Sequence, residues 1–314
     1  MNIQKCGVIG CGGVGATTAY TLIESGIFNE VVLIDVDRKR AEGEALDIGH
    51  GIPFTVPSKI YAGGYEDLQD AYVVIVAAGV NQLPGETRLD ISAKNGQVFR
   101  QIIPQIVKYN TECILLIVTN PVDILTSLTL KLSGFPKERV IGSGTVLDTA
   151  RLKYLLGEKL NLDSRNIHAW IIGEHGDTEL ATWSSATVAG LPLDEYCQRV
   201  GCEKDSLELN EIYEEVRDSA YHIIERKGST FYAVAMAVRR ITEALVRDER
   251  SILTISSLAQ GHYGLKDICI GLPTVVGRGG AEQIIEIPLN EEEQEKLHAS
   301  AAALQKIYDG IKED

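Results

Sequence analysis

Gly10-Cys11-Gly12-Gly13-Val14-Gly15 is the stretch of sequence that decides the fold of this chain. Its first, second and fourth glycines fit the pattern GxGxxG. An apolar run at residues 6–9 precedes it, and one face of a helix follows it at Val14, Thr18 and Leu22. In such a strand–turn–helix unit the first of these glycines permits the tight turn, the second lets the backbone approach a pyrophosphate, and the last lets helix and strand pack closely. The turn therefore predicts a dinucleotide site, against the alternative of a glycine-rich turn that binds no ligand.

Asp35 strengthens this interpretation, because it lies twenty residues after Gly15 at the end of the next apolar run, residues 30–35. A carboxylate at this place accepts a hydrogen bond from the ribose 2′-OH and repels the 2′-phosphate of NADP, which predicts NAD as the cofactor. Methyltransferases also place an acidic residue after a glycine-rich turn. From the turn alone they remain an alternative.

Strand and helix patterns alternate along the first half of the chain. Residues 72–77 and 113–118 are two further apolar runs, and a charged helical segment covers residues 37–48. Strands that are apolar along their whole length are buried on both faces, as in a parallel sheet. We therefore predict an α/β fold whose N-terminal domain, residues 1–145, is a doubly wound (Rossmann) parallel sheet.

The second half has a mixed pattern that predicts an α+β substrate domain over residues 146–314. Its expected helices cover residues 148–160 and 206–247, the latter interrupted near Gly228, and a last helix capped by Asn290 with Glu293 three residues later. Its expected strands cover residues 166–172, 267–276 and 282–287. No linker separates the halves, so we expect them to pack closely.

Composition excludes several classes of protein. A formal net charge of −14 repels phosphate backbones, so no nucleic-acid partner is predicted. The longest apolar stretch, residues 72–80, is far short of the ~20 residues that span a bilayer, and the first five residues leave no room for a signal peptide. Six cysteines without a CxxC pair, with Cys6 and Cys113 in apolar runs, favour a reducing, cytoplasmic location. The histidines show no ligand spacing, so no metal is predicted.

Three segments carry residues suited to reducing a 2-oxo acid, which requires a carboxylate clamp, a polarised carbonyl and a proton donor. His175, within Gly173-Glu-His-Gly-Asp177, titrates near neutral pH and can give and take a proton, unless it is a plain surface-turn histidine. Asp148 and Arg151 project from the same face of a helix and could orient His175 and bind a carboxylate, unless they form an ordinary surface ion pair.

Arg88 ends the third segment, residues 79–88, whose glycines and proline suit a hinged lid. In a doubly wound sheet the loop after a strand lies over the ligand crevice, so closing this lid would bring a cation onto the carbonyl oxygen. The alternative is a solvated loop arginine.

Together with Thr119-Asn-Pro-Val-Asp123, these segments resemble the lactate/malate dehydrogenase superfamily, and within it most closely the bacterial L-lactate dehydrogenases. The likeness runs from the N-terminal glycines to at least Thr230 and removes the methyltransferase alternative. It implies reversible hydride transfer between NADH and pyruvate, giving (S)-lactate and NAD. It also implies His175 as general acid/base, Asp148 as its orienter, Arg151 as carboxylate clamp and Arg88 as lid arginine.

The same resemblance implies contacts for further residues. Asn120 would contact the substrate and the nicotinamide side, and Thr230 would line the pocket at the methyl end of the substrate. The residues at positions where the family contacts its cofactor are Gly10, Gly12, Gly13, Val14, Gly15, Asp35, Arg40, Tyr65, Gly79, Asn120 and Ser143.

Gln82 bears on the choice of substrate. Malate dehydrogenases of the superfamily carry a second arginine at the matching lid position, to pair an extra carboxylate, whereas Gln82 is neutral. A buried unpaired carboxylate is costly, so Gln82 predicts pyruvate rather than oxaloacetate, without excluding bulkier 2-oxo acids. The alternatives are a malate or broad 2-hydroxy-acid dehydrogenase and, from another class, a non-catalytic NAD-binding protein. The presence of all four chemical residues speaks against the last.

Lys153 and His168 bear on regulation. Many bacterial members of the family are allosteric enzymes activated by fructose 1,6-bisphosphate, which binds a basic residue just past the substrate arginine and a histidine before GEHGD. This chain has Lys153 and His168 there; lysine keeps the charge of the commoner arginine but loses its bidentate fork. The alternative is a surface lysine and an ordinary strand histidine. The resemblance also implies a homotetramer and a role in glycolysis, in pyruvate fermentation to lactate.

Overall fold

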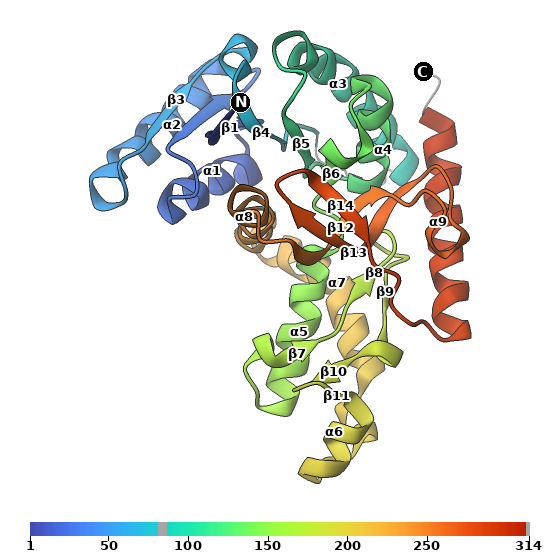
Figure 1. Cartoon of the computed structure of the whole chain (residues 1–314). Coiled ribbons are helices and arrows are strands. Elements are labelled where there is room, and N and C mark those ends of the chain that lie inside the picture. The colour runs from blue at the N-terminus through green and yellow to red at the C-terminus, as the bar shows by residue number, and fades with distance from the viewer. Residues whose placement is uncertain (81–86, 312–314) are drawn as a thin grey trace.

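A nine-stranded sheet runs through the molecule in the order β14-β13-β12-β6-β5-β4-β1-β2-β3 (Figure 1). The computed structural model describes residues 1–80 and 87–311. The first six strands of the sheet, in chain order, are parallel and lie in the order 3-2-1-4-5-6 of a doubly wound fold. This confirms the predicted α/β fold class. They are β1 (Asn2–Ile9), β2 (Glu30–Ile34), β3 (Lys59–Ala62), β4 (Ala71–Val76), β5 (Ile114–Ile117) and β6 (Val140–Gly142).

Two apolar cores enclose this parallel sheet, one on each face. Along β4, Val73 and Ile75 point into one core and Val74 and Val76 into the other, as the continuous apolar run predicts. The first core is covered by α1 (Gly13–Ser25), α2 (Arg38–His50) and α8 (Tyr232–Arg247). The second is covered by α3 (Arg88–Tyr109) and α4 (Val122–Ser133).

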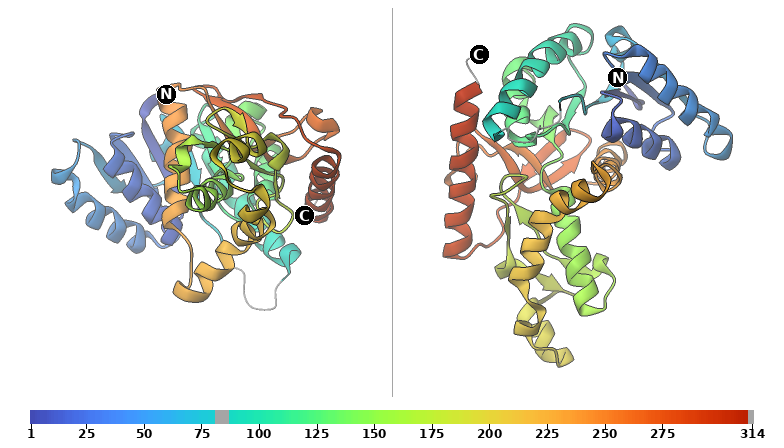
Figure 2. Two further views of the ribbon diagram at one scale, coloured as in Figure 1. Left: turned by 90° about the horizontal axis from the view of Figure 1, so that it is seen from below. Right: turned by 180° about the vertical axis from the view of Figure 1, so that it is seen from behind.

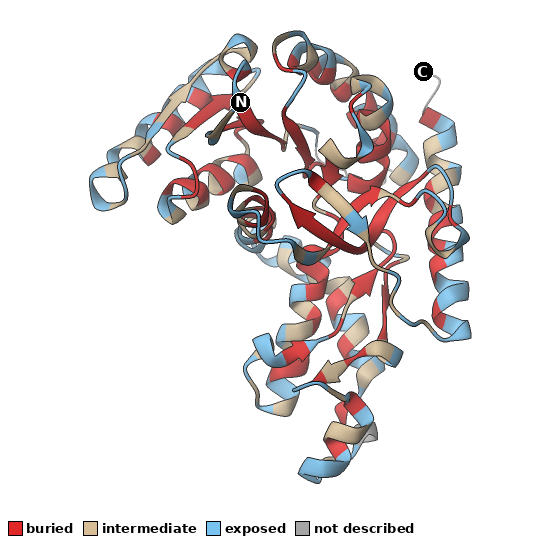
Figure 3. Cartoon of the chain, in the orientation of Figure 1, coloured by how far each residue is buried: buried red, intermediate tan, exposed pale blue. Residues whose placement is uncertain are grey.

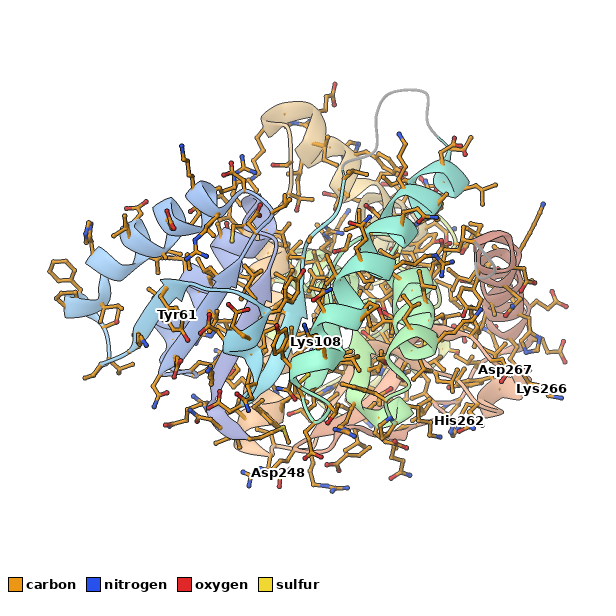
Figure 4. All side chains as sticks on the ribbon, turned by 90° about the horizontal axis from the view of Figure 1, so that it is seen from above. Tyr61, Lys108, Asp248, His262, Lys266 and Asp267 are labelled. Atoms are coloured by element: carbon orange, nitrogen blue, oxygen red, sulfur yellow. The ribbon has the colours of Figure 1, made fainter. Side chains whose placement is uncertain are left out.

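Strands from the second half of the chain extend the same sheet. β12 (Ser251–Leu258), β13 (Cys269–Gly277) and β14 (Gly280–Ile284) are antiparallel, and β12 joins β6. The sheet therefore crosses the division expected at residue 145. Figure 4 shows its extent: Tyr61 of β3 lies at one end of the molecule, and His262 and Asp267, from the loop between β12 and β13, lie at the other.

A smaller lobe lies beyond the sheet and has its own apolar core (Figure 1). It contains α5 (Val146–Leu160), α6 (Leu193–Val200), α7 (Leu209–Lys227), β7 (Ile167–His168), β10 (Thr187–Val188) and β11 (Leu191–Pro192). The helical pattern of residues 206–247 breaks where expected, because Gly228 ends α7 in a left-handed conformation (φ 83°).

The single strand expected at residues 166–172 is wrong, because the segment forms two short strands in different sheets. β7 pairs with β10, whereas β8 (Ile171–Ile172) pairs with β9 (Leu180–Ala181). The backbone N–H and C=O of Ile171 both bond the hydroxyl of Thr149 on α5. These bonds draw β8 away from the line of β7 and toward α5.

The last helix, α9 (Glu291–Ile311), lies at the opposite end of the molecule from the N-terminal strands (Figure 2). The predicted capping box is present: the N–H of Glu293 donates to Asn290 Oδ1 at 2.8 Å, and the N–H of Asn290 donates to Glu293 Oε2 at 3.0 Å. Buried residues form a stripe along α9 in Figure 3, including Leu297, Leu304 and Ile311. In the described ranges, 1–80 and 87–311, no helix is long and apolar enough to cross a membrane.

The glycine turn between β1 and α1 is packed against backbone at two positions and open at a third. A Cβ on Gly15 would lie 1.7 Å from the carbonyl oxygen of Gly10, and Gly10 has a left-handed φ of 95°. Gly12, by contrast, has an ordinary φ of −71°, and a Cβ there would meet nothing within 4 Å.

Gly15→Ala therefore should destabilise the protein by about 3 kcal/mol or more, the upper end of the cost of overpacking, because the clash is with rigid backbone. Gly12→Ala is the matched control and should change the free energy of unfolding by less than about 1 kcal/mol. Denaturant unfolding measures both. Equal stabilities for the two variants would contradict this account of the turn.

Candidate active site

The carboxyl ends of the parallel strands bring the expected cofactor residues to one edge of the sheet. The glycine turn follows β1, Gly79 follows β4, Asn120 follows β5 and Ser143 follows β6. Of the other expected contacts, Arg40 is exposed on α2 and Tyr65 is half-buried after β3. This edge is where doubly wound sheets bind ligands.

Asp35 is fixed beside the glycine turn. Its Oδ2 accepts a hydrogen bond of 2.6 Å from the N–H of Cys11, and its Oδ1 accepts one of 2.9 Å from the N–H of Asp37. The side chain is only partly buried, so the carboxylate can also accept from a ribose hydroxyl. The open space at Gly12 and the acid at Asp35 fit a dinucleotide.

Asn95 of α3, which sequence reasoning missed, ties two of these strand ends together. Its amide nitrogen donates to the carbonyl of Asn120 at 2.7 Å, and its Oδ1 accepts from the N–H of Val80 at 2.8 Å. A Cβ on Gly79 would lie 2.5 Å from Thr119 and 2.9 Å from Asn95 Oδ1, so only glycine fits there. No sequence motif marks Asn95.

His175, Asp148 and Arg151 form a directly bonded chain. Nδ1 of His175 lies 2.5 Å from Oδ2 of Asp148, and Nη1 of Arg151 donates to Oδ1 of the same carboxylate at 2.8 Å. The Asp148 side chain is 2% exposed, that of Arg151 13% and that of His175 23%. The carboxylate is thus buried behind two groups that both reach toward solvent.

Hydroxyl groups at the start of α5 hold β8, and hence the His175 loop, in place. Thr145 and Thr149 donate to the carbonyl of Ile171 at 2.6 and 3.2 Å. Asp148 lies in the first turn of the same helix, where the helix dipole favours an anion. The same helix therefore positions both the strand before His175 and the acid that orients its ring.

The electrostatics favour an ionised Asp148 and a basic His175. Burial alone lowers the pKa of His175, but the negative charge of Asp148 and its hydrogen bond outweigh burial and raise it above the ordinary value. Burial likewise raises the pKa of Asp148, but His175 and Arg151 hold it below its usual range. The imidazole can therefore carry a proton near neutral pH and release it to a reacting oxygen.

Arg88, the first residue of α3, lies against the His175 loop. Its Nη1 lies 2.9 Å from Oε1 of the buried Glu174, and its Nη2 donates to the carbonyl of His175 at 3.1 Å. A Cβ on Gly176 would lie 1.9 Å from this guanidinium, so Gly176 makes room for it. The structure therefore brings Arg88 to the loop that carries His175.

Asp123 and Ser300 support the loop from opposite sides, and sequence reasoning gave neither a role. Asp123, 1% exposed, accepts the N–H of His175 at 2.8 Å, and burial raises its pKa to about 6. Ser300 of α9 accepts the N–H of Glu174 at 2.9 Å. Asp123 belongs to the motif Thr119–Asp123 and could have been found there, whereas nothing in the alanine-rich α9 marks Ser300.

Two other predicted residues do not bond to this group. Asn120 is exposed and Thr230 half-buried, and in the described part of the chain neither bonds His175. Phe231, the residue after Thr230, packs on the glycine turn: a Cβ built on Gly13 would lie 3.3 Å from its ring. The segment that contains Thr230 therefore lies beside this turn. Gln82 lies outside the described residues.

Asp148, His175 and Glu179 also present potential metal-ligating atoms within 4.8 Å of one another. The guanidinium of Arg151, 2.8 Å from Asp148, already supplies a positive charge to this cluster. A second cation beside it would be repelled, so the donor set fits proton transfer better than metal binding.

Nearly the whole chain matches one family of proteins. Residues 4–142 match the lactate/malate dehydrogenase NAD binding domain, and residues 145–314 match the alpha/beta C-terminal domain of the same family. The chain therefore belongs to the lactate/malate dehydrogenase family, whose N-terminal domain binds NAD. This confirms the resemblance inferred from the motifs.

Relatives within the family are similar over nearly their full length. The L-lactate dehydrogenase of Acetivibrio thermocellus is 56% identical over 97% of this chain and 96% of its own length. L-lactate dehydrogenase 1 of Clostridium acetobutylicum is 52% identical over 98% of both. A crystal structure of the minor L-lactate dehydrogenase of Enterococcus mundtii, in a ligand-bound form, superposes with a TM-score of 0.95 at 39% identity, covering 99% of both chains.

The coupling between Asp148 and His175 can be tested by NMR titration of the imidazole. In the wild-type protein the pKa of His175 should lie above 6.5. Asp148→Asn should lower it, because the charge and hydrogen bond of Asp148 are lost while burial and the charge of Arg151 still lower the pKa. Asp177→Asn, which removes an exposed carboxylate two residues away, is the control and should leave the titration unchanged. An equal shift in both variants would contradict a specific Asp148–His175 pair.

Proposed function

We propose that this chain is an L-lactate dehydrogenase, transferring hydride reversibly between NADH and pyruvate to give (S)-lactate and NAD. The observation that carries the proposal is the buried Asp148 carboxylate bonded at once to His175 and Arg151. It joins the proton donor to the arginine that would bind the substrate carboxylate, a group that the reaction leaves unchanged. Family membership and the names of the relatives support the same activity.

Each residue of the cluster has a role that its surroundings suit. Arg151 offers the two N–H groups of its guanidinium to the substrate carboxylate. Asp148 bonds both the guanidinium and the imidazole and so holds them at fixed positions relative to each other. His175 gives its proton to the carbonyl oxygen during reduction and takes it back during oxidation. Arg88 leaves Glu174 and faces the same oxygen, where its charge stabilises the developing negative charge. When bound, NADH supplies the hydride to the carbonyl carbon.

The cofactor contacts that we propose follow the edge of the sheet, with residues 1–145 as the NAD-binding unit and residues 146–314 as the substrate unit. Asn120 and Thr230 contact the substrate, and Gln82 contacts its methyl end. The proposed cofactor residues are Gly10, Gly12, Gly13, Val14, Gly15, Asp35, Arg40, Tyr65, Gly79, Asn120 and Ser143.

Assembly and location are further parts of the proposal. We propose a homotetramer, which apolar side chains exposed around α2 support: Leu46 is 62% exposed, Phe54 90% and Val56 50%. Exposed apolar groups of this size are typical of surfaces that another subunit covers. A reducing cytoplasm, where glycolysis supplies pyruvate, suits the six cysteine thiols.

Substrate choice tests the function. The wild-type protein should oxidise NADH faster with pyruvate than with oxaloacetate, because Gln82 leaves the second carboxylate of oxaloacetate unpaired. Gln82→Arg should shift the ratio of kcat/KM values toward oxaloacetate on the order of 100-fold. Steady-state kinetics with both substrates measure the ratio.

Gln82→Leu is the neutral control and should keep the preference for pyruvate. A wild-type preference for oxaloacetate would mean that the protein is a malate dehydrogenase on the same scaffold. Binding of NADH with no turnover of any 2-oxo acid would revive the non-catalytic alternative.

We also propose that fructose 1,6-bisphosphate binds Lys153 and His168. The two residues lie on α5 and β7, which pack together. Lys153 is half-buried and no described residue forms an ion pair with it, and burial lowers its pKa. A bound phosphate would supply the missing negative charge.

The effector should therefore lower the KM for pyruvate, and Lys153→Ala or His168→Ala should abolish that change. Lys159→Ala, on the same helix and already paired with Glu208, is the control and should respond as the wild type does. Initial rates at varied pyruvate, with and without effector, measure the effect. Unchanged kinetics of the wild type at saturating effector would contradict an allosteric site.

A further inference from the structure

Glu179 is a buried acid that the proposed mechanism does not use. It follows the His175 loop directly before β9 and is 4% exposed. Its carbonyl accepts the hydroxyl of Tyr213 at 2.6 Å, and its N–H donates to Gly176 at 3.1 Å. These backbone bonds fix the residue against both the loop and α7.

The carboxyl group of Glu179 faces the reacting cluster. One of its oxygens lies within 4.8 Å of a carboxylate oxygen of Asp148 and of a ring nitrogen of His175. Its Oε1 is buried and has no hydrogen-bond partner in the part of the chain that the structure describes. An ionised carboxylate without a partner would be a costly occupant of such a place.

In the part of the chain that the structure describes, no arginine or lysine forms an ion pair with Glu179. Arg151 donates to Asp148 at 2.8 Å, and Arg217 of α7 is paired with Asp218 at 2.9 Å. Two buried carboxyl groups this close, with the available cation bound to one of them, cannot both ionise near neutral pH. Since His175 and Arg151 both stabilise the Asp148 anion, Glu179 is the one that stays protonated.

The surrounding charges agree with that assignment. The pKa of Glu179 is raised to about 10, chiefly by burial and next by the negative charge of Asp148, while the charge of Arg151 opposes the rise. Glu174 from the loop adds to the rise, while Arg217 from α7 opposes it. Tyr213 faces Glu179 from the same helix.

We propose that Glu179 is a positioning residue held as a neutral carboxylic acid beside Asp148, so that of these two neighbouring carboxyl groups only Asp148 acts on His175 as an anion. A second anion here would stabilise the imidazolium further and hinder His175 from releasing its proton. This role rests on the proposed dehydrogenase function, but the protonation of Glu179 does not. A neutral Glu179 therefore can be tested on the protein without any substrate.

The test compares the stability of the wild type and Glu179→Gln, which is isosteric and cannot ionise. An acid whose folded pKa is raised stabilises the fold fully below its unfolded pKa, and this contribution is lost as pH rises toward the folded value. Between about pH 5 and 9 the folding equilibrium constant of the wild type should thus fall relative to that of Glu179→Gln by about tenfold per pH unit. Glu225→Gln, on the exposed surface of α7, is the control and should show no such trend.

Two further measurements decide the proposal. The pKa of His175 and the pH profile of kcat/KM should be the same in Glu179→Gln as in the wild type; a fall of the His175 pKa by about one unit or more would show that Glu179 is an anion and overturn the proposal. Infrared spectra of the wild type at about pH 8 should contain the C=O band of a protonated glutamic acid, and its absence would overturn the proposal even if the variant did not fold.

Discussion

The bond of one buried carboxylate, Asp148, to both His175 and Arg151 is the interaction on which the rest of the site depends. Burying that anion costs several kcal/mol unless partners compensate it, so the fold must supply two cations or donors at fixed positions. α5 supplies Arg151 one turn away, and the hydroxyl groups of the same helix anchor β8, which delivers His175. The contacts that position His175 and Arg151 are therefore the same contacts that offset the cost of burying Asp148.

The overall charge of −14 makes these local cations more important. At long range an acidic surface repels anions, so pyruvate and the cofactor pyrophosphate must be held by near contacts. Arg151 keeps its carboxylate partner while facing outward, and Arg88 rests on Glu174. Neither cation is left without a partner, which limits the cost of burying its charge before a substrate binds.

Sequence patterns predict most of the parallel sheet and the bonded cluster. Continuous apolar runs identify β1, β2, β4 and β5. Helical spacing places Asp148 and Arg151 on one face, and the family that the motifs resemble implies that His175 and Arg88 join them. The patterns miss β3 and β6, which have four and three residues and too little periodicity to stand out. They also miss Ser300 and Glu179, whose importance comes from contacts across the fold rather than from local sequence.

The continuous sheet explains why the two halves of the chain act as one unit. β12 pairs with β6, so the strands of the second half are hydrogen-bonded to the cofactor sheet rather than merely packed on it. Across this junction Asp123 of the first half accepts the N–H of His175 of the second. Gly173 and Gly271 bond each other in both directions at 2.9 Å and tie the His175 loop to β13. A hinge between the halves would break these bonds, so the sheet and the His175 loop hold the two halves in a fixed relation.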